Sequence, residues 1–149
     1  MKKIKCILLV DDDATTNFLN EELIHELEIT EEIHVALNGQ EALDYLHKRG
    51  KFKTTKKDKY PVPSLIFLDI NMPLMGGFEF LEKYHKLPKS KKAEVVIVFL
   101  TTSDSHKDKL KQLDDEVVRD FIEKPLKRKE LLKIMKEHFW GNAKNQKNS

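Results

Sequence analysis

LIFLDINMP, residues 65–73, is a run of four apolar residues that leads directly into the carboxylate of Asp69. Turn-forming residues bound the run on both sides, with prolines before it and Pro73, Gly76 and Gly77 behind it. A short, uniformly apolar run between turn signals is typical of a strand that is buried on both faces of a parallel sheet. The pattern therefore predicts Asp69 at the carboxyl end of a central strand, which is where ligands bind in open α/β sheets.

Apolar runs alternate with helical patterns along the whole chain. Besides 65–69, the runs that predict strands are residues 4–10, 33–37, 95–100 and a fifth run that closes with Phe121 and Ile122. A pattern of helical spacing follows each of the five runs. Five repeats of strand and helix predict an α/β fold, with a parallel sheet covered by helices on both faces.

The first helical pattern indicates which side of that helix is expected to be buried. Leucines recur at positions i, i+4 and i+8, and neighbouring apolar residues widen the stripe. The stripe consists of Phe18, Leu19, Leu23, Ile24 and Leu27. We expect it to face the core, and we expect Asp13 to cap the amino end of the helix.

Length and composition bound the class of protein. The 149 residues suit one domain with a real core, since 40% of them are apolar. A net charge of +2 makes no general case for nucleic-acid binding, and no apolar run reaches the roughly 18 residues of a membrane span. The amino terminus leads into a strand without a signal-peptide pattern, which favours a cytoplasmic protein. We expect one domain over residues 3–140 and a disordered polar tail over 141–149.

Residues 48–60 form a strongly basic stretch. It contains one acidic residue, Asp58, against seven basic ones, which are Lys48, Arg49, Lys51, Lys53, Lys56, Lys57 and Lys59. One interpretation is a solvated surface loop, and the other is a docking surface for an acidic partner. Its aromatic residues are only Phe52 and Tyr60, which disfavours contacts with a membrane or with nucleic acid.

Polar side chains stand where four of the expected strands end. Asp11 and Asp12 follow the first strand, Asp69 ends the third, Thr101 follows the fourth, and Lys124 follows the fifth. The carboxyl ends of parallel strands meet at one rim of the sheet. We therefore expect these five side chains around a single crevice.

The chemistry of this set indicates phosphoryl transfer. Clustered carboxylates repel one another, and a divalent cation relieves the repulsion. Oxygen ligands suit Mg²⁺, while the lack of a cysteine or histidine cluster disfavours zinc. Lys124 offers a compact positive charge for one phosphoryl oxygen, and Thr101 offers a hydrogen bond for another. With Asp69 as nucleophile, the product is an acyl phosphate.

Four motifs occur in order at these strand ends. They are Val10-Asp11-Asp12, Asp69-x-x-Met72-Pro73-x-Met75-x-Gly77, Leu100-Thr101-Thr102 and Lys124-Pro125. Together they resemble the receiver domain of two-component response regulators, over roughly residues 3–140. The resemblance implies a flavodoxin-like fold, which is a doubly wound, five-stranded parallel sheet of order 2-1-3-4-5.

The resemblance also implies a role for each residue at the rim. Asp69 would accept a phosphoryl group from a phosphohistidine on a sensor histidine kinase or a phosphotransfer protein. Asp12, Asp69 and the backbone carbonyl of Asn71 would bind Mg²⁺ directly, and Asp11 would bind it through water. Lys124 would hold a phosphoryl oxygen.

Switching and hydrolysis follow from the same resemblance. Thr101 would move toward the phosphate, and Phe121 would turn inward behind it. Phe121 lacks the hydroxyl of a tyrosine, so its part in the switch would be steric. Asn71 and Ser103 would set the access of water to the acyl phosphate, and the peptide bond before Pro125 would be cis.

The expected output is a contact with another protein, because no effector domain follows the last helix. The only catalysis expected is on the chain's own phosphorylation and dephosphorylation. Relatives often dimerise through the face made by the fourth helix, the fifth strand and the last helix, so this face is the expected contact surface for a homodimer or for an unidentified target. The long basic loop is similar to that of small stand-alone regulators, including ones paired with phytochrome-type kinases.

Two other interpretations use the same residues. Asp11-x-Asp13-x-Thr15 also fits the first motif of haloacid-dehalogenase-type phosphatases, with Asp11 as nucleophile and Asp13 as acid and base. Those enzymes need another acidic pair at a later strand end, and no aspartate follows Lys124. A degenerate receiver that acts only as an interaction module is disfavoured, because each residue needed for phosphorylation is present.

Overall fold

The computed structural model of the chain describes residues 2–92, 95–102, 113 and 115–141. They contain one five-stranded parallel sheet, in the order β2-β1-β3-β4-β5. The strands are β1 (Ile4–Val10), β2 (Thr30–Ala36), β3 (Leu65–Asp69), β4 (Val96–Thr101) and β5 (Val118–Glu123). The fold class and the strand order predicted from the sequence are confirmed.

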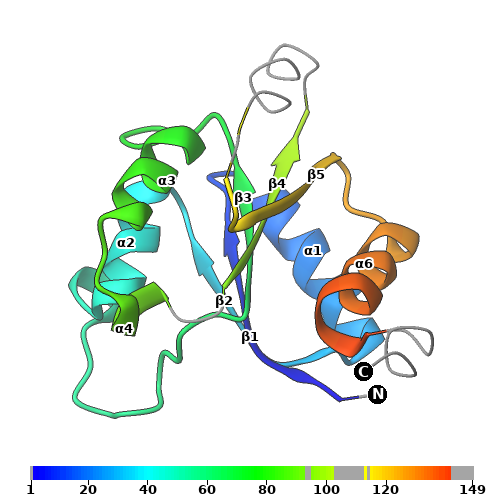
Figure 1. The fold of residues 1–149 in the computed structure, drawn as a ribbon, viewed down its shortest axis with the longest axis horizontal. Coiled ribbons are helices and arrows are strands. Elements are labelled where there is room, and N and C mark those ends of the chain that lie inside the picture. The colour runs from blue at the N-terminus through cyan, green and yellow to red at the C-terminus, as the bar shows by residue number, and fades with distance from the viewer. Residues whose placement is uncertain (1, 93–94, 103–112, 114, 142–149) are drawn as a thin grey trace.

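Helices cover both faces of the sheet (Figure 1). Helices α1 (Ala14–Leu27) and α6 (Arg128–Met135) lie on one face, and α2 (Gly39–His47) and α3 (Gly77–His85) lie on the other. The shorter elements are a 3₁₀ helix η1 (Gly50–Phe52), α4 (Lys89–Lys92) and a π-helix η3 (Lys136–Trp140). Most of the expected fourth helix lies outside the described residues, and residues 115–117 are not helical.

The central strands are buried on both faces, as their uniformly apolar sequences predict. Leu8 and Ile66 pack in the core beneath α2 and α3. Ile7 and Phe67, one residue away along the same strands, pack in the core beneath α1 and α6. Because side chains alternate between the two faces of a strand, β1 and β3 are held from both sides. The packed strands therefore fix the backbone at Asp69, which ends β3, and at Asp11, which follows β1.

Helix α1 turns a different side to the core than its apolar pattern predicts. Phe18 is 60% exposed and Leu19 is 58% exposed, whereas Ile24 is fully buried. The first half of the helix buries Asn17 instead, whose Nδ2 donates to the Asp11 carbonyl at 2.9 Å. The expectation that Phe18 and Leu19 face the core was therefore wrong. The hydrogen bond from Asn17 to the Asp11 carbonyl, just after β1, sets the rotation of the helix.

The cap of this helix agrees with the sequence. Asp13 is the N-cap of α1, and its carboxylate accepts from the Thr15 N–H at 3.0 Å. At the opposite end of the chain, the indole N–H of Trp140 donates to the carbonyl of Lys2 at 2.8 Å. The start of β1 and the end of η3 therefore lie beside each other (Figure 1).

Two further sequence predictions concern the polar tail and the lack of a membrane span. Residues 142–149, which include most of the predicted tail, lie outside the described residues. Among the residues that the structure describes, no helix has both the length and the apolar character needed to cross a membrane.

Candidate functional site

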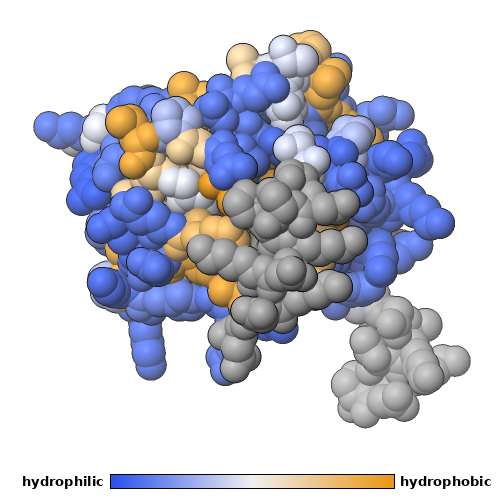
Figure 2. All heavy atoms as spheres, turned by 90° about the horizontal axis from the view of Figure 1, so that it is seen from above, coloured by the Kyte–Doolittle hydropathy of each residue, from blue (hydrophilic) through white to orange (hydrophobic). Residues whose placement is uncertain are grey.

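The carboxyl ends of the strands form the rim at the top of Figure 1. The parallel register places the ends of β3, β4 and β5 at nearly the same height, since Asp69 pairs with Leu100 and Thr101 pairs with Glu123. The predicted site residues Asp11, Asp12, Asp69, Thr101 and Lys124 all stand at or directly after these ends. Seen from above, the rim side is mainly hydrophilic, with small separate apolar patches (Figure 2).

Three carboxylates and one ammonium group converge at the rim. Asp11, Asp12 and Asp69 each place a carboxylate oxygen within 4.8 Å of the other two. Lys124 Nζ donates to Asp11 Oδ2 at 2.6 Å and lies 3.3 Å from Asp69 Oδ1. Asp11 is buried, whereas Asp12 is exposed. The site thus has a buried, charge-paired side and an open side.

The pKa values of Asp69 and Lys124 are both raised, which disfavours the charged form of Asp69 and favours the charged form of Lys124. Burial raises the pKa of Asp69, the negative charge of Asp11 raises it further, and Lys124 opposes both. Burial alone lowers the pKa of Lys124, but its hydrogen bond to Asp11 and the charge of Asp69 outweigh burial and raise that pKa. Lys124 is therefore firmly protonated, while the charge on Asp69 is only partly compensated.

The donor chemistry of the cluster fits Mg²⁺. All three side chains offer carboxylate oxygens, and the exposed Asp12 faces solvent, so that water can complete an octahedral shell. Asn71 follows Asp69 by two residues and is exposed, and its backbone carbonyl would be a further oxygen donor. These four residues would hold the ion.

Backbone and side-chain hydrogen bonds orient Asp11. Its Oδ1 accepts from the Asp13 N–H at 2.9 Å, and its carbonyl accepts from Asn17. The Asp13 carboxylate is occupied at the helix cap, where it also accepts from Thr16 Oγ1 at 3.0 Å. This role leaves no support for Asp13 as a phosphatase acid and base. Asn17 was missed by sequence reasoning, because nothing in a helical pattern marks an asparagine as the partner of a distant carbonyl.

The loop between β3 and α3 folds tightly over the end of β3. The Gly77 N–H donates to the Ile70 carbonyl at 2.9 Å, and a Cβ at Gly77 would lie 2.5 Å from the carbonyl oxygen of Asp69. Only glycine fits such a close approach. Leu74 sits at the tip with φ 67°, and it is 86% exposed. The glycines of the Asp69 motif thus let the loop pack against the reactive strand end.

The remaining predicted residues occupy different places. Thr101 ends β4, and its carbonyl accepts from the Lys124 N–H at 2.7 Å, which joins the ends of β4 and β5. The Lys124–Pro125 peptide bond is cis. Phe121 lies within β5, outside the acid cluster, and is 39% exposed. Ser103 lies outside the described residues.

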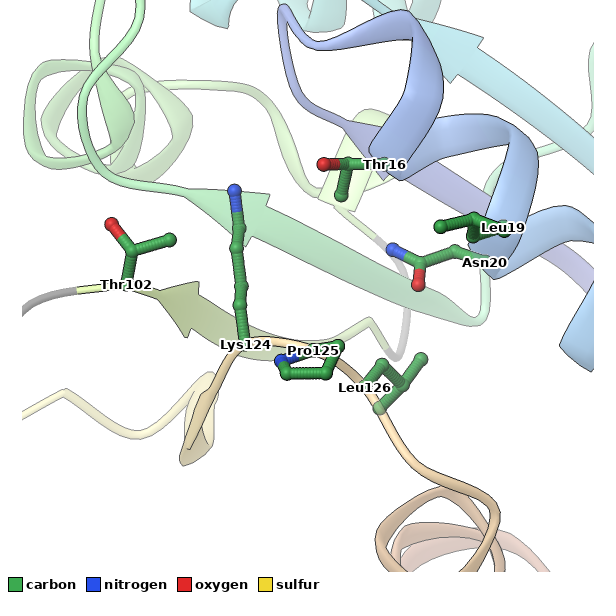
Figure 3. Close-up of a pocket in the computed structure, with 7 residues that line it drawn as sticks. All are labelled: Thr16, Leu19, Asn20, Thr102, Lys124, Pro125 and Leu126. Carbon is green, nitrogen blue, oxygen red and sulfur yellow. The ribbon is translucent and has the colours of Figure 1, made fainter.

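A pocket of about 300 Å³ opens beside the rim, between α1 and the segment after β5. It is lined by Thr16, Leu19, Asn20, Thr102, Lys124, Pro125 and Leu126. Figure 3 shows Leu19 and Asn20 on α1 across from Pro125 and Leu126, with Lys124 extending from the end of β5. The exposure of Leu19 therefore gives this pocket part of its apolar wall.

A family model for the response regulator receiver domain matches residues 7–136. The chain belongs to this family. As a receiver domain of a response regulator, it works in phosphorelay signalling. The fold and the order of its strands are those expected of the family, and the phosphatase interpretation is not favoured.

Known response regulators resemble this receiver domain along most of its length. It is 30% identical over 138 residues to response regulator Rcp1 from Synechocystis, covering 91% of this chain and 88% of that protein. A two-component response regulator from Cytophaga hutchinsonii has a TM-score of 0.76 at 27% identity, covering 94% and 100% of the two chains. The phosphorylated cyanobacterial phytochrome response regulator RcpA has a TM-score of 0.66 at 28% identity, covering 90% of each chain.

Longer proteins contain matching segments as well. This receiver domain spans 7% of each of two hybrid signal transduction histidine kinases from Dictyostelium discoideum. Segments similar in sequence to this receiver domain thus occur both as most of a short regulator and inside much longer signalling proteins.

Proposed function

We propose that Asp69 accepts a phosphoryl group from a phosphohistidine on a sensor histidine kinase or a phosphotransfer protein. The position of Lys124 carries the proposal, since its Nζ lies 3.3 Å from Asp69 Oδ1 and 2.6 Å from Asp11 Oδ2. An ammonium group fixed beside a carboxylate at an open rim provides the countercharge for phosphoryl oxygens before they arrive. The phosphorylated relative RcpA supports the same chemistry.

The transfer balances without any further reactant. A carboxylate oxygen of Asp69 bonds to phosphorus while the P–N bond to the donor histidine breaks, and the electron pair stays on the imidazole nitrogen. Lys124 holds a phosphoryl oxygen of the product. Asp12, Asp69 and the Asn71 carbonyl would hold Mg²⁺ directly and Asp11 would hold it through water, and the ion would supply Lewis-acid stabilisation of the phosphoryl oxygens. The later attack of water returns the carboxylate and inorganic phosphate, with Asn71 and Ser103 setting its access.

The signal then passes through a changed protein-contact surface. Thr101 moves toward the phosphoryl group, and Phe121, which is partly exposed in β5, turns inward into the space behind it. This is a population shift between two conformations. The target or a second copy binds at the face made by β5, α6 and the helix expected between β4 and β5. We assign this activity to residues 3–140 and to a cytoplasmic location.

Intact-mass measurement with acetyl phosphate and Mg²⁺ tests the phosphoacceptor. The wild-type chain is expected to gain one phosphoryl group in the presence of Mg²⁺ and none with a chelator. Asp69→Asn abolishes the gain, whereas the control Asp58→Asn, in the exposed loop, keeps it. An adduct that survives Asp69→Asn and disappears in Asp11→Asn would overturn the proposal. If acetyl phosphate gives no adduct, a phosphorylated phosphotransfer domain replaces it as donor, and failure with both donors overturns the proposal as well.

A further inference from the structure

The loop between α2 and β3 is anchored by aromatic packing. Phe52 is 5% exposed, and its ring centroid lies 5.0 Å from that of Tyr45 and 5.2 Å from that of Tyr60, edge-on to both. The Tyr45 hydroxyl donates to the Pro61 carbonyl at 2.7 Å. Residues 53–59 therefore run between two packed rings. Their basic side chains project from a supported loop and not from a free one.

Acidic neighbours neutralise two of the seven basic side chains in this loop. Arg49 Nε lies 2.8 Å from Asp44 Oδ1, and Lys51 Nζ lies 2.7 Å from Glu41 Oε1. The other five form no ion pair with any described residue, and all are exposed: Lys48, Lys53, Lys56, Lys57 and Lys59. A fold that pairs two cations and leaves five in solvent has an excess of positive charge at one place.

Helix α4 extends the same positive surface. Residues 83–92 contain five lysines and no acidic residue. Burial lowers the pKa of His47, and the charges of Arg49 and Lys91 lower it further, so the loop and α4 act on one imidazole. Figure 1 shows α4 and the loop together, at the opposite end of the sheet from the rim. We call Lys48, Lys53, Lys56, Lys57, Lys59, Lys89 and Lys91 the basic face.

The side chains available on the basic face restrict its ligand. The seven cations of the basic face are all lysines, which are point charges without the planar fork that recognises phosphate in two-point fashion, and the neighbouring Arg49 is paired with Asp44 through its Nε. The Phe52 ring is buried, and the half-buried Tyr60 ring packs edge-on against it with Lys59 Nζ 5.4 Å from the Tyr60 centroid, so both rings are engaged within the loop, which disfavours stacking on a nucleobase. The exposed large apolar side chains of the described chain all lie elsewhere, so the basic face has none to insert into a lipid surface. This combination of exposed lysines without free rings or apolar side chains favours the carboxylates of a polypeptide.

We propose that the basic face binds a segment of a partner protein that is rich in aspartate and glutamate. Many exposed lysine–carboxylate contacts act chiefly through long-range attraction, which raises the association rate and weakens with salt. The face lies opposite the rim, so the partner leaves Asp69 open to its phosphodonor. The inference is independent of the proposed phosphotransfer.

A labelled polyglutamate peptide tests this proposal in binding titrations at about 0.15 M salt and at a lower concentration. One variant replaces Lys53, Lys56, Lys57 and Lys59 by serine. Its control replaces Lys127, Lys129, Lys133 and Lys136, which are exposed on and beside α6, and has the same net charge. The loop variant is expected to bind at least about tenfold more weakly, while the control binds like the wild type. Both variants keep the wild-type melting temperature and the wild-type yield of acetyl-phosphate adduct.

Three results would overturn the proposal. Equal weakening in the loop variant and in the control would mean that net charge alone governs binding. Tighter binding of phosphatidylserine vesicles or of single-stranded DNA than of polyglutamate, lost in the loop variant, would assign the face to another anion. Self-association at low salt that disappears in the loop variant would assign it to a second copy of the chain.

Discussion

Asp69 is a residue whose negative charge the fold disfavours. Burial and the neighbouring Asp11 raise its pKa, and a raised carboxyl pKa adds stability only at low pH and loses it as the pH rises through the folded-state value. We therefore expect Asp69→Asn to increase the free energy of unfolding at pH 7 without metal, and to lose this advantage in acid. Urea denaturation in a chelator measures it. A variant that is less stable than the wild type at pH 7 would contradict the argument.

Cys6 makes stability depend on pH at the alkaline end. Burial raises the pKa of its thiol from the ordinary 9.0 to about 11, against the opposing hydrogen bond with Tyr45. Its contribution is therefore complete below pH 9 and is lost as the pH rises through about 11. Burial raises the pKa of Tyr84 to about 12, with the same sign. We expect the free energy of unfolding to fall above pH 9, with a smaller slope in Cys6→Ala, as measured by urea denaturation.

Two substitutions in helix α1 test which of its sides is buried in the core. Ile24 is fully buried, so Ile24→Ala is expected to cost about 2–5 kcal/mol of unfolding free energy. Leu19 is 58% exposed, so Leu19→Ala is expected to change it by no more than about 0.5 kcal/mol. Chemical denaturation of the two variants provides the comparison. Equal losses would mean that the apolar stripe in the sequence faces the core after all.

Limited proteolysis tests whether the packing of Phe52 and Tyr60 holds the basic segment 53–59 in place. Its lysines are all sites for trypsin, yet the wild-type loop is expected to resist cleavage because Phe52 packs against both Tyr45 and Tyr60. Phe52→Ala removes that anchor, so limited proteolysis is expected to cut within residues 53–59 at least about tenfold faster. The exposed-site control Phe18→Ala is expected to leave the rate unchanged. Rapid cleavage of the wild type would show that the loop is not held.

Elements were predictable where one local pattern decides them. The apolar runs of β1 and β3 follow from burial on both faces, and the cap at Asp13 follows from its position before a helix. The rotation of α1 was not predictable, because it depends on a hydrogen bond from the Asn17 side chain to the Asp11 carbonyl, in the connection after β1. Phe52 is similar: its neighbours in the sequence are charged, and its partner rings come together only in the folded chain.

At the scale of the whole molecule, metal binding and folding are linked. A ligand that binds only the native state adds about 2.7 kcal/mol at a concentration one hundred times its dissociation constant. We expect Mg²⁺ to raise the melting temperature, since it also relieves repulsion among Asp11, Asp12 and Asp69. Asp12→Asn is expected to lose most of this shift, and Asp58→Asn is expected to keep it. The same shift in all three chains would place the ion elsewhere.

The convergence of the site was predictable because it follows from topology. In a parallel sheet, residues that follow successive strands meet at one rim, so the meeting of Asp11, Asp69 and Lys124 needs no knowledge of side-chain detail. The bridging position of Lys124 between two carboxylates was not predictable, because it depends on the β4–β5 register and on the path of the chain at Pro125. Whole-chain connectivity thus carried more of the prediction than local chemistry did.

The hydrogen bond from Trp140 to the carbonyl of Lys2 has a practical consequence for attaching fluorescent probes to the molecule. It brings both ends of the described chain to neighbouring points, on the side away from the rim that carries Asp69 (Figure 1). Two fluorophores attached there start close together, and neither obstructs the phosphodonor. A chain labelled at both ends therefore reports whether these ends stay close together while residues at the rim are modified.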